Sequence, residues 1–112
     1  MIILTAKGEQ VSVNITLDDD EELLKIITIF RVLSDPSRLK ILGTLTSGDN
    51  LCVSEIADKL SMSISRVSHH LSMLDSLGFL KRSQSGKQVY YMIDDDCIID
   101  VMMRVQDHVR GE

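Results

Sequence analysis

The segment from Val53 to Ile93 constrains the fold more than any other part of the chain. It holds two stretches with helical spacing of apolar residues, separated by Ser61-Met62-Ser63 and followed by Gly78. A basic segment rich in β-forming residues comes next. Two helices joined by a tight turn and followed by a β-hairpin are typical of a winged helix-turn-helix, whose second helix fits the DNA major groove and whose wing reaches the adjacent backbone. We therefore predict sequence-specific DNA binding rather than catalysis.

The two helices of this motif can be placed residue by residue. The first is predicted to open near Cys52, three residues before Glu55, where a usual cap residue would form a capping box but the position holds cysteine. The second is predicted to run from a cap at Ser63 to Leu77, before Gly78. The second helix is predicted to bury Val67, His70, Leu71, Leu74 and Leu77 and to expose Ser65, Arg66, His69 and Ser72. Exposed polar side chains on the first turns of such a helix suit contacts with bases and phosphates.

The wing is predicted between Leu80 and Ile93, with its turn at Ser83-Gln84-Ser85-Gly86. Tyr90 and Tyr91 are expected to pack on the sheet rather than to stack on bases, because buried aromatic residues combine a large apolar body with one polar contact.

Helical spacing also occurs before and after this motif. A first helix is expected from Asp18, which forms a capping-box pattern with Glu21, and Asp35-Pro36 marks the start of a second. A last helix is expected to begin within residues 94–96 and to end at Gly111. The apolar positions are Leu23, Leu24, Ile27, Phe30 and Leu33 in the first helix, Leu39, Leu42 and Leu45 in the second, and Ile98, Val101, Met102 and Val105 in the last. The predicted fold is mainly α with a small β-hairpin, in the order α-α-α-α-β-β-α.

The N-terminal residues form a separate part of this organisation. Val11, Val13, Ile15 and Leu17 alternate with polar residues, which suggests a short strand or an extended arm. We expect an arm over residues 1–17 and a single DNA-binding and dimerisation domain over residues 18–110.

Composition excludes several classes of protein. The hydrophobic content of 44% can fill a core, but no run approaches the roughly 20 apolar residues that span a bilayer. The first residues are too short an apolar run for a signal peptide, and two distant cysteines make a disulfide framework unlikely, so we expect a cytoplasmic protein. The sequence contains neither a glycine-rich phosphate loop nor a recognisable nucleophile-base motif, so an enzyme is not expected.

Charge is unevenly distributed along the chain. The net charge is −5, yet residues 61–91 carry four basic residues and one acidic residue. Positive charge therefore coincides with the predicted DNA-reading helix and wing, where phosphates would be contacted. A solvated turn is the alternative explanation for the basic hairpin, and a winged helix that binds proteins is the alternative suggested by the negative total.

Four segments together resemble the ArsR/SmtB family of repressors: FRVLSDPSRLKIL, LCVSEIADKL, SMSISRVSHHLSMLDSLGFL and KQVYYMI. The resemblance covers roughly residues 30–109. It implies a homodimer whose first and last helices form the interface, which binds a palindromic operator and is released by an inducer, most often a metal ion. The apolar stripes of the first and last helices independently favour a dimer, because a small monomer would leave them exposed.

The resemblance also implies which side chains meet DNA. It assigns Ile64, Ser65, Ser68 and His69 to reading positions, although Ile64 replaces a residue that is often polar. With the helix cap and the basic side chains, the predicted DNA-binding set is Ser63, Ser65, Arg66, Ser68, His69, Lys81, Arg82 and Lys87.

The resemblance implies two recurrent metal sites at which an inducer ion could bind. The cysteine-rich one is depleted here, because only Cys52 is present in its segment and residues 1–22 contain no cysteine. We expect Cys52 to be a small buried cap residue; the alternative is a reactive redox thiol, since a helix N-terminus lowers a thiol pKa.

The second family site lies on the last helix. The candidate ligands are Asp95, Cys97, His108 and Glu112. Cys97 and His108 share a helix face but lie about 16 Å apart along the axis, so only two antiparallel helices of a dimer could complete a site, for zinc or another thiophilic ion. Helix capping by Asp95, core packing by Cys97 and a dipole contact by His108 are the structural alternatives. A metal-independent or thiol-redox-responsive repressor therefore stays open as a second function.

Overall fold

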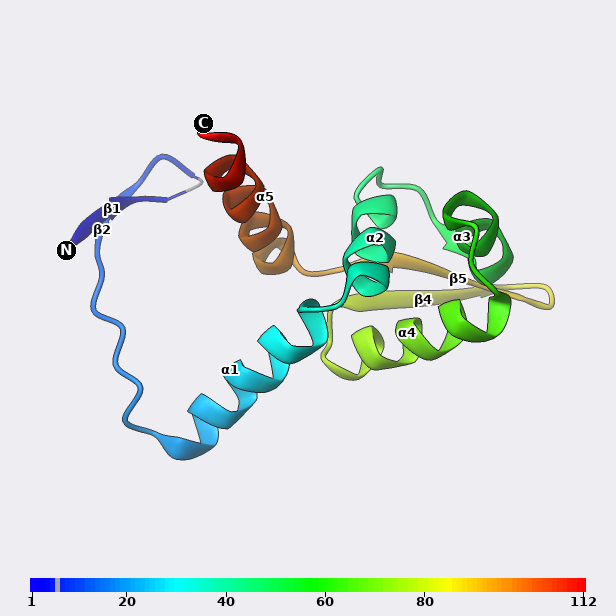
Figure 1. Cartoon of the computed structure of the whole chain (residues 1–112), viewed down its shortest axis with the longest axis horizontal. Coiled ribbons are helices and arrows are strands. Elements are labelled where there is room, and N and C mark those ends of the chain that lie inside the picture. Colours follow the sequence, from blue (N-terminus) through cyan, green and yellow to red (C-terminus); the bar gives the residue numbers. More distant parts are fainter. Residues whose placement is uncertain (6) are drawn as a thin grey trace.

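The computed structural model describes residues 1–5 and 7–112 and confirms a mainly helical winged helix-turn-helix (Figure 1). Its elements are β1 (Ile2–Leu4), β2 (Gln10–Ser12), α1 (Asp20–Leu33), α2 (Pro36–Leu45), β3 (Leu51–Cys52), α3 (Val53–Leu60), α4 (Ile64–Ser76), β4 (Leu80–Ser85), β5 (Gln88–Ile93) and α5 (Asp96–Arg110). The predicted order of helices and wing is therefore confirmed. The two-residue strand β3 and the N-terminal pairing of β1 with β2 were not predicted.

The hydrophobic core lies where α2, α3 and α4 meet the base of the wing. Its fully buried side chains come from these three helices and are Ile41, Leu42, Leu45, Ile56, Val67, Leu71 and Leu74. They are aliphatic, as the low aromatic content of the chain requires. Ile98, at the start of α5, and Phe79, before β4, close the core from the other side.

A three-stranded antiparallel sheet with the order β3-β5-β4 forms the wing and its base. Tyr90 and Tyr91 of β5 pair with Cys52 and Leu51, so the wing is joined to the residues that precede α3. Both tyrosines are half-buried and Tyr91 packs against the core, in agreement with their predicted packing role.

The wing turn differs from the prediction. Ser83, Gln84 and Ser85 belong to β4, and Ser85 pairs directly with Gln88, so the turn contains only Gly86 and Lys87. Gly86 has a φ of 63°, and a two-residue hairpin favours glycine at its first central position because β-carbon sterics disfavour positive φ.

Two further details of the helices were predicted incorrectly. The cap of α1 is Asp19 rather than Asp18, because its Oδ1 accepts the N–H groups of Glu21 and Glu22. On α2, Leu39 is 41% exposed and lines an apolar groove, whereas Ile41 is completely buried in the core. The exposure of Val105 of α5, by contrast, agrees with the expectation that a single chain leaves part of the last helix's apolar stripe uncovered.

The N-terminal residues extend away from the helical body. β1 pairs with β2, and the chain then runs without regular structure to Asp19. Arg104 of α5 donates through Nη2 to the carbonyl of Leu4 at 3.2 Å, and Figure 1 shows this hairpin near the C-terminal end of α5.

The molecule is extended for its size. Its radius of gyration is 16.0 Å, whereas a compact chain of this length has a radius of gyration of about 13 Å. α1, α5 and the N-terminal hairpin project from the core in Figure 1 and account for this difference. Within the described residues, no helix combines the length and hydropathy needed to cross a membrane.

Candidate nucleic-acid interface

The turn between α3 and α4 sets the orientation of α4. Ser61 ends α3 in the left-handed conformation, with a φ of 54°, and Ser63 starts α4 by accepting the N–H of Arg66 on its side-chain oxygen at 3.1 Å. Met62, between them, packs against the core. A turn fixed at both ends by helix termini and in the middle by a buried side chain is rigid, so α4 is presented at a defined angle.

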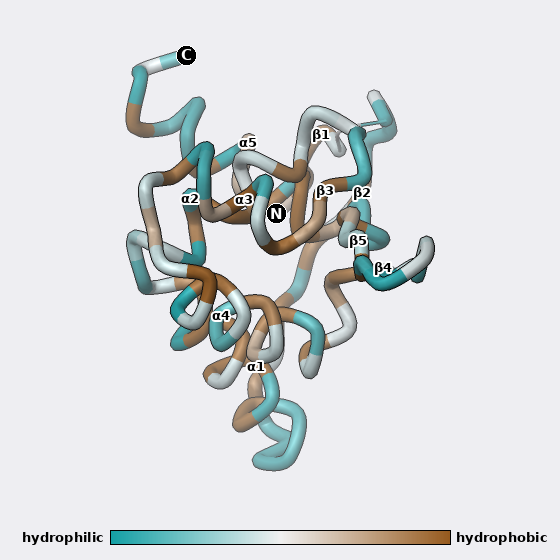
Figure 2. The backbone as a smooth tube through the Cα atoms, turned by 90° about the vertical axis from the view of Figure 1, so that its right-hand side faces the viewer, coloured by the Kyte–Doolittle hydropathy of each residue, from teal (hydrophilic) through white to brown (hydrophobic). Residues whose placement is uncertain are grey.

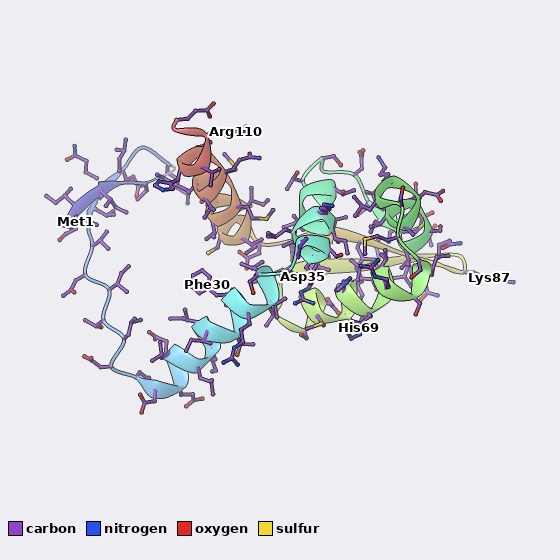
Figure 3. All side chains as sticks on the ribbon, in the orientation of Figure 1. Met1, Phe30, Asp35, His69, Lys87 and Arg110 are labelled. Carbon is purple, nitrogen blue, oxygen red and sulfur yellow. The ribbon has the colours of Figure 1, made fainter. Side chains whose placement is uncertain are left out.

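The outer face of α4 carries the polar residues predicted to meet DNA. Ser65, Arg66, Ser68 and His69 are all exposed, and Val67, Leu71 and Leu74 on the opposite face are fully buried. Figure 3 shows His69 on the outer side of α4. Burial of the inner face therefore fixes which side chains point outward, and the predicted assignment of faces matches the structure. The DNA contacts themselves stay a prediction.

Ile64 and Arg66 begin this face and have different surroundings. Ile64 is 59% exposed and is one of several large aliphatic side chains on the described surface. Arg66 donates from Nη2 to Oγ of Ser37 at 3.1 Å, so α4 is linked to the first turn of α2. Ser37 was not predicted as part of the interface, because its relation to α4 depends on long-range packing that local sequence does not reveal.

The wing carries the other basic side chains. Lys81, Arg82 and Lys87 are exposed, and Lys87 lies at the tip of the hairpin in Figure 3. The two-residue turn places it there, whereas the predicted turn would have placed it in a strand. Arg82 forms an ion pair with Asp75 of α4, with Nε and Oδ2 3.5 Å apart. Asp75 thus holds the guanidinium of Arg82 against α4. The tip of the wing is hydrophilic (Figure 2).

A second set of polar contacts lies behind α4, at the start of α2. Asp35 caps α2 by accepting the N–H of Arg38 at 2.9 Å, and this hydrogen bond lowers the pKa of its carboxyl group. His70, predicted to be buried, is half-buried beside Arg38, and burial lowers the pKa of its imidazole. Arg38 was missed by sequence reasoning. Its available signal was its place just after the end of α1, where the last helix carbonyls need donors and Pro36 offers no N–H.

Cys52 occupies the cap position of α3, as predicted. Its side chain is buried, with Sγ 3.2 Å from Oγ of Ser54, and its N–H donates to Oε1 of Glu55 at 3.0 Å. The latter hydrogen bond lowers the pKa of Glu55. The expectation of a small buried cap residue is confirmed.

The four candidate metal ligands of the last helix are not brought together in one chain. Asp95 caps α5 by accepting the N–H of Cys97 at 2.8 Å, while His108 is exposed in the last turn. Gly111 ends α5 in the left-handed conformation, so Glu112 lies beyond the helix. Cys97 is exposed, so its interpretation as a core residue was wrong. Among the described residues, no three His, Cys, Asp or Glu side chains form a metal-sized group. The donors of a single chain therefore do not fit an ion.

An apolar groove of about 880 Å³ lies between α1, α2 and α5. Phe30 of α1, which points toward the space beside α5 in Figure 3, is 60% exposed, and Met103 and Val105 of α5 are 56% and 58% exposed. Large apolar side chains gathered in this way usually mark an interaction surface. The two helices that the sequence predicted as a dimer interface therefore share one unfilled apolar surface.

Comparison with known proteins adds three matches. The family model described as "Bacterial regulatory protein, arsR family" matches residues 35–82, from the cap of α2 to the start of β4. The cadmium resistance transcriptional regulatory protein CadC of Listeria innocua is 42% identical over 73 residues, which are 65% of this chain and only 61% of that protein. The transcriptional repressor SmtB homolog of Synechocystis is 33% identical over 95 residues, or 85% of this chain and 69% of that protein.

The fold is also found among solved structures. The crystal structure of NolR from Sinorhizobium fredii matches with a TM-score of 0.76 and 22% identity, over 89% of this chain and 98% of that one. The sequence matches are to transcriptional regulators, in agreement with the prediction that the chain is not an enzyme. The resemblance drawn from the sequence is thereby confirmed, and the chain belongs to the ArsR family of bacterial regulatory proteins.

Proposed function

We propose that this chain is a transcriptional repressor that binds operator DNA as a homodimer. The observation that carries the proposal is the outer face of α4, where Ser65, Arg66, Ser68 and His69 are exposed beside a basic wing. Hydroxyl and imidazole groups can hydrogen-bond to base edges in the major groove, and Arg66 can contact phosphates. Ser63 caps α4, whose N-terminal N–H groups favour a phosphate.

The basic wing supports the same docking. Lys81, Arg82 and Lys87 give the wing positive charge in a protein whose net charge is −5. Negative charge is concentrated elsewhere, in residues 18–22 at the start of α1 and residues 94–96 at the start of α5, so the surface potential would orient the molecule with α4 and the wing toward DNA. The domain over residues 18–110 would hold this interface, with residues 1–17 as an arm, and the protein would act in the cytoplasm, where bacterial DNA lies.

Dimerisation is the second part of the proposal. The exposed apolar side chains of α1 and α5 would be buried against those of a second copy, and a two-fold axis there would present two α4 helices to a palindromic site. The homodimer also explains why one chain alone is so extended.

We further propose that binding of a metal ion releases the repressor from DNA. CadC is named for cadmium resistance, and α5 of this chain carries Cys97 and His108 as exposed donors near its two ends. Two antiparallel copies of α5 would bring Asp95 and Cys97 of one chain near His108 of the other, where thiolate and imidazole suit zinc or another thiophilic ion. Thiol oxidation is the competing trigger, and the exposure of Cys97 makes it the accessible thiol, whereas Cys52 is buried.

The test is fluorescence anisotropy of the full chain on labelled DNA from its own promoter region. With a chelator present, binding that weakens steeply with salt and exceeds binding to scrambled DNA supports the repressor. Equal affinity for both DNAs would contradict sequence-specific binding. Release on adding zinc or cadmium, lost in Cys97→Ser, supports metal sensing. Release by peroxide without any response to metal supports the redox alternative.

A further inference from the structure

The side chain of Arg38 links its own helix, α2, to two others, α1 and α4. Arg38 lies in the first turn of α2, and its Nε donates to the carbonyl oxygen of Val32 in the last turn of α1 at 2.6 Å. Its Nη1 lies 3.3 Å from Nδ1 of His70 and 3.5 Å from Sδ of Met73, both on α4. One half-buried side chain therefore joins the apolar helix α1 to the helix proposed to read DNA.

The contact with α1 fills a gap in helix hydrogen bonding. Val32 lies in the last turn of α1, where backbone carbonyls have no N–H donor within the helix. The residue four positions later is Pro36, which has no N–H to offer. Val32 is only 7% exposed, so water is a poor substitute donor. Arg38 supplies the missing hydrogen bond, and a charged donor makes it stronger than a neutral one. The end of α1 is thereby tied to Arg38.

The contact with α4 requires one state of His70. A guanidinium group only donates hydrogen bonds, so Nδ1 of His70 must be the acceptor and the ring proton must sit on Nε2. Burial lowers the pKa of His70; the charges of Arg38, His69 and Arg66 lower it as well, while Asp35 opposes them. The ring is therefore neutral at neutral pH, as the hydrogen bond to Arg38 requires.

We propose that Arg38 is a positioning residue that holds α4 in its DNA-reading orientation by hydrogen-bonding neutral His70 while it is anchored to the end of α1. Protonation of Nδ1 places a donor against a donor and a cation against a cation, so the contact breaks and α4 loses its tie to α1. DNA affinity consequently falls as the pH drops through the pKa of His70. This proposal rests on the proposed DNA-binding function and deepens it, because it connects the dimer helix to the operator face.

The first test does not depend on DNA. Long-range ¹H–¹⁵N correlation spectra of the imidazole rings in the full chain report which nitrogen carries the proton. At neutral pH, His70 is expected to be neutral with its proton on Nε2, and Arg38→Met should raise its pKa by removing a neighbouring cation. A proton on Nδ1, or a doubly protonated ring, would overturn the proposal even if the protein binds its operator.

The second test measures operator affinity from about pH 7.5 down to about pH 5, well below the usual histidine pKa, because the pKa of His70 is lowered. A second histidine, His69, lies on the exposed face of α4, so the comparison is made in the His69→Gln background. That variant should lose about tenfold in affinity at the acidic end, the size of effect typical of coupling through a side-chain network. Adding His70→Asn, whose side-chain oxygen accepts without titrating, should make the profile flat.

Arg38→Lys provides the matched control for charge. Lysine keeps the cation but is a point donor that cannot reach Val32 and His70 together, so it should weaken operator binding at neutral pH without unfolding the chain. Identical pH profiles with and without His70→Asn, or full operator affinity in folded Arg38→Lys, would overturn the positioning role. If the wild type binds no operator at any pH, the proposed function fails and the positioning role with it, whereas the tautomer measurement still reports on the Arg38–His70 contact.

Discussion

The exposed side chains at the start of α4 differ in the contacts they can make with DNA. Ser68 and His69 carry short hydrogen-bonding groups suited to base edges, whereas Arg66 has a long cationic side chain suited to phosphates. In the free protein Arg66 is hydrogen-bonded to Ser37, which keeps its guanidinium close to the start of α2. An exposed hydrogen bond of this kind is worth about 1 kcal/mol, so a phosphate can replace it.

Loss of a phosphate contact should be visible in the salt dependence of binding. Arg66→Ala and Lys81→Ala are each expected to weaken operator binding and to reduce the slope of log affinity against log salt by about 1, because fewer counterions are released. The control is Lys25→Ala, since Lys25 lies on α1 and is paired with Glu21. Unchanged slopes in both variants would show that DNA docks on another face.

Base reading makes a different prediction. Ser68→Ala or His69→Ala is expected to cost about 1–3 kcal/mol of operator affinity while affinity for scrambled DNA changes little, because a base contact is made only on the correct sequence. Titrations of both DNAs at one salt concentration measure the ratio. Ser76→Ala, in the last turn of α4, should leave the ratio unchanged. Equal losses on both DNAs would count against base reading.

At the scale of elements, local signals predicted the helices better than the wing. Helix starts at Asp35-Pro36 and Ser63, and the end of α5 at Gly111, were correct because caps depend on a few neighbouring residues. The wing turn was placed too early, since polar residues of an exposed strand resemble turn residues in sequence. Strand register is set by pairing with β5, which local sequence does not reveal.

The candidate site shows the same division. The exposed face of α4 was predicted correctly because helical periodicity alone determines it. The contacts of Arg66 with Ser37 and of Arg82 with Asp75 were missed, because each joins different elements that meet only in the folded chain. The burial of Cys52 was expected from its residue type, whereas Cys97 was open to two interpretations that only packing could decide.

The cap of α2 predicts how stability depends on pH. The Arg38 N–H holds the pKa of Asp35 below its usual value, so Asp35 stabilises the fold above the unfolded-state pKa and this contribution is lost as pH falls below about 4. Asp35→Asn should cap α2 without titrating, and its unfolding temperature should therefore fall less steeply in acid than that of the wild type. Asp49→Asn, in an exposed loop, should follow the wild-type curve. Parallel curves for Asp35→Asn and the wild type would contradict this role.

At the scale of the whole molecule, the chain buries a hydrophobic core but leaves large apolar side chains of α1 and α5 exposed. Leu33 of α1 and Ile98 of α5 are buried within the chain, so both helices are anchored to the core. The remainder of each helix exposes large apolar residues along the groove that α1, α2 and α5 share. A second copy bound there would cover them, and it would also fix the separation of the two α4 helices on which operator spacing depends.

Phe30 offers the sharpest test of this assembly because its substitution leaves the core intact. Phe30→Asp is expected to give a folded monomer, since Phe30 is 60% exposed in the chain and a charge there would be buried unpaired only in the dimer. Sedimentation velocity measures the mass, and circular dichroism checks the fold. Ile64→Asp is the matched control, because Ile64 is equally exposed, at 59%, but lies on α4 and should leave the dimer intact. The monomer should bind operator weakly, since one α4 helix contacts only a half-site. A Phe30→Asp variant that still sediments as a dimer would contradict an interface formed by α1 and α5.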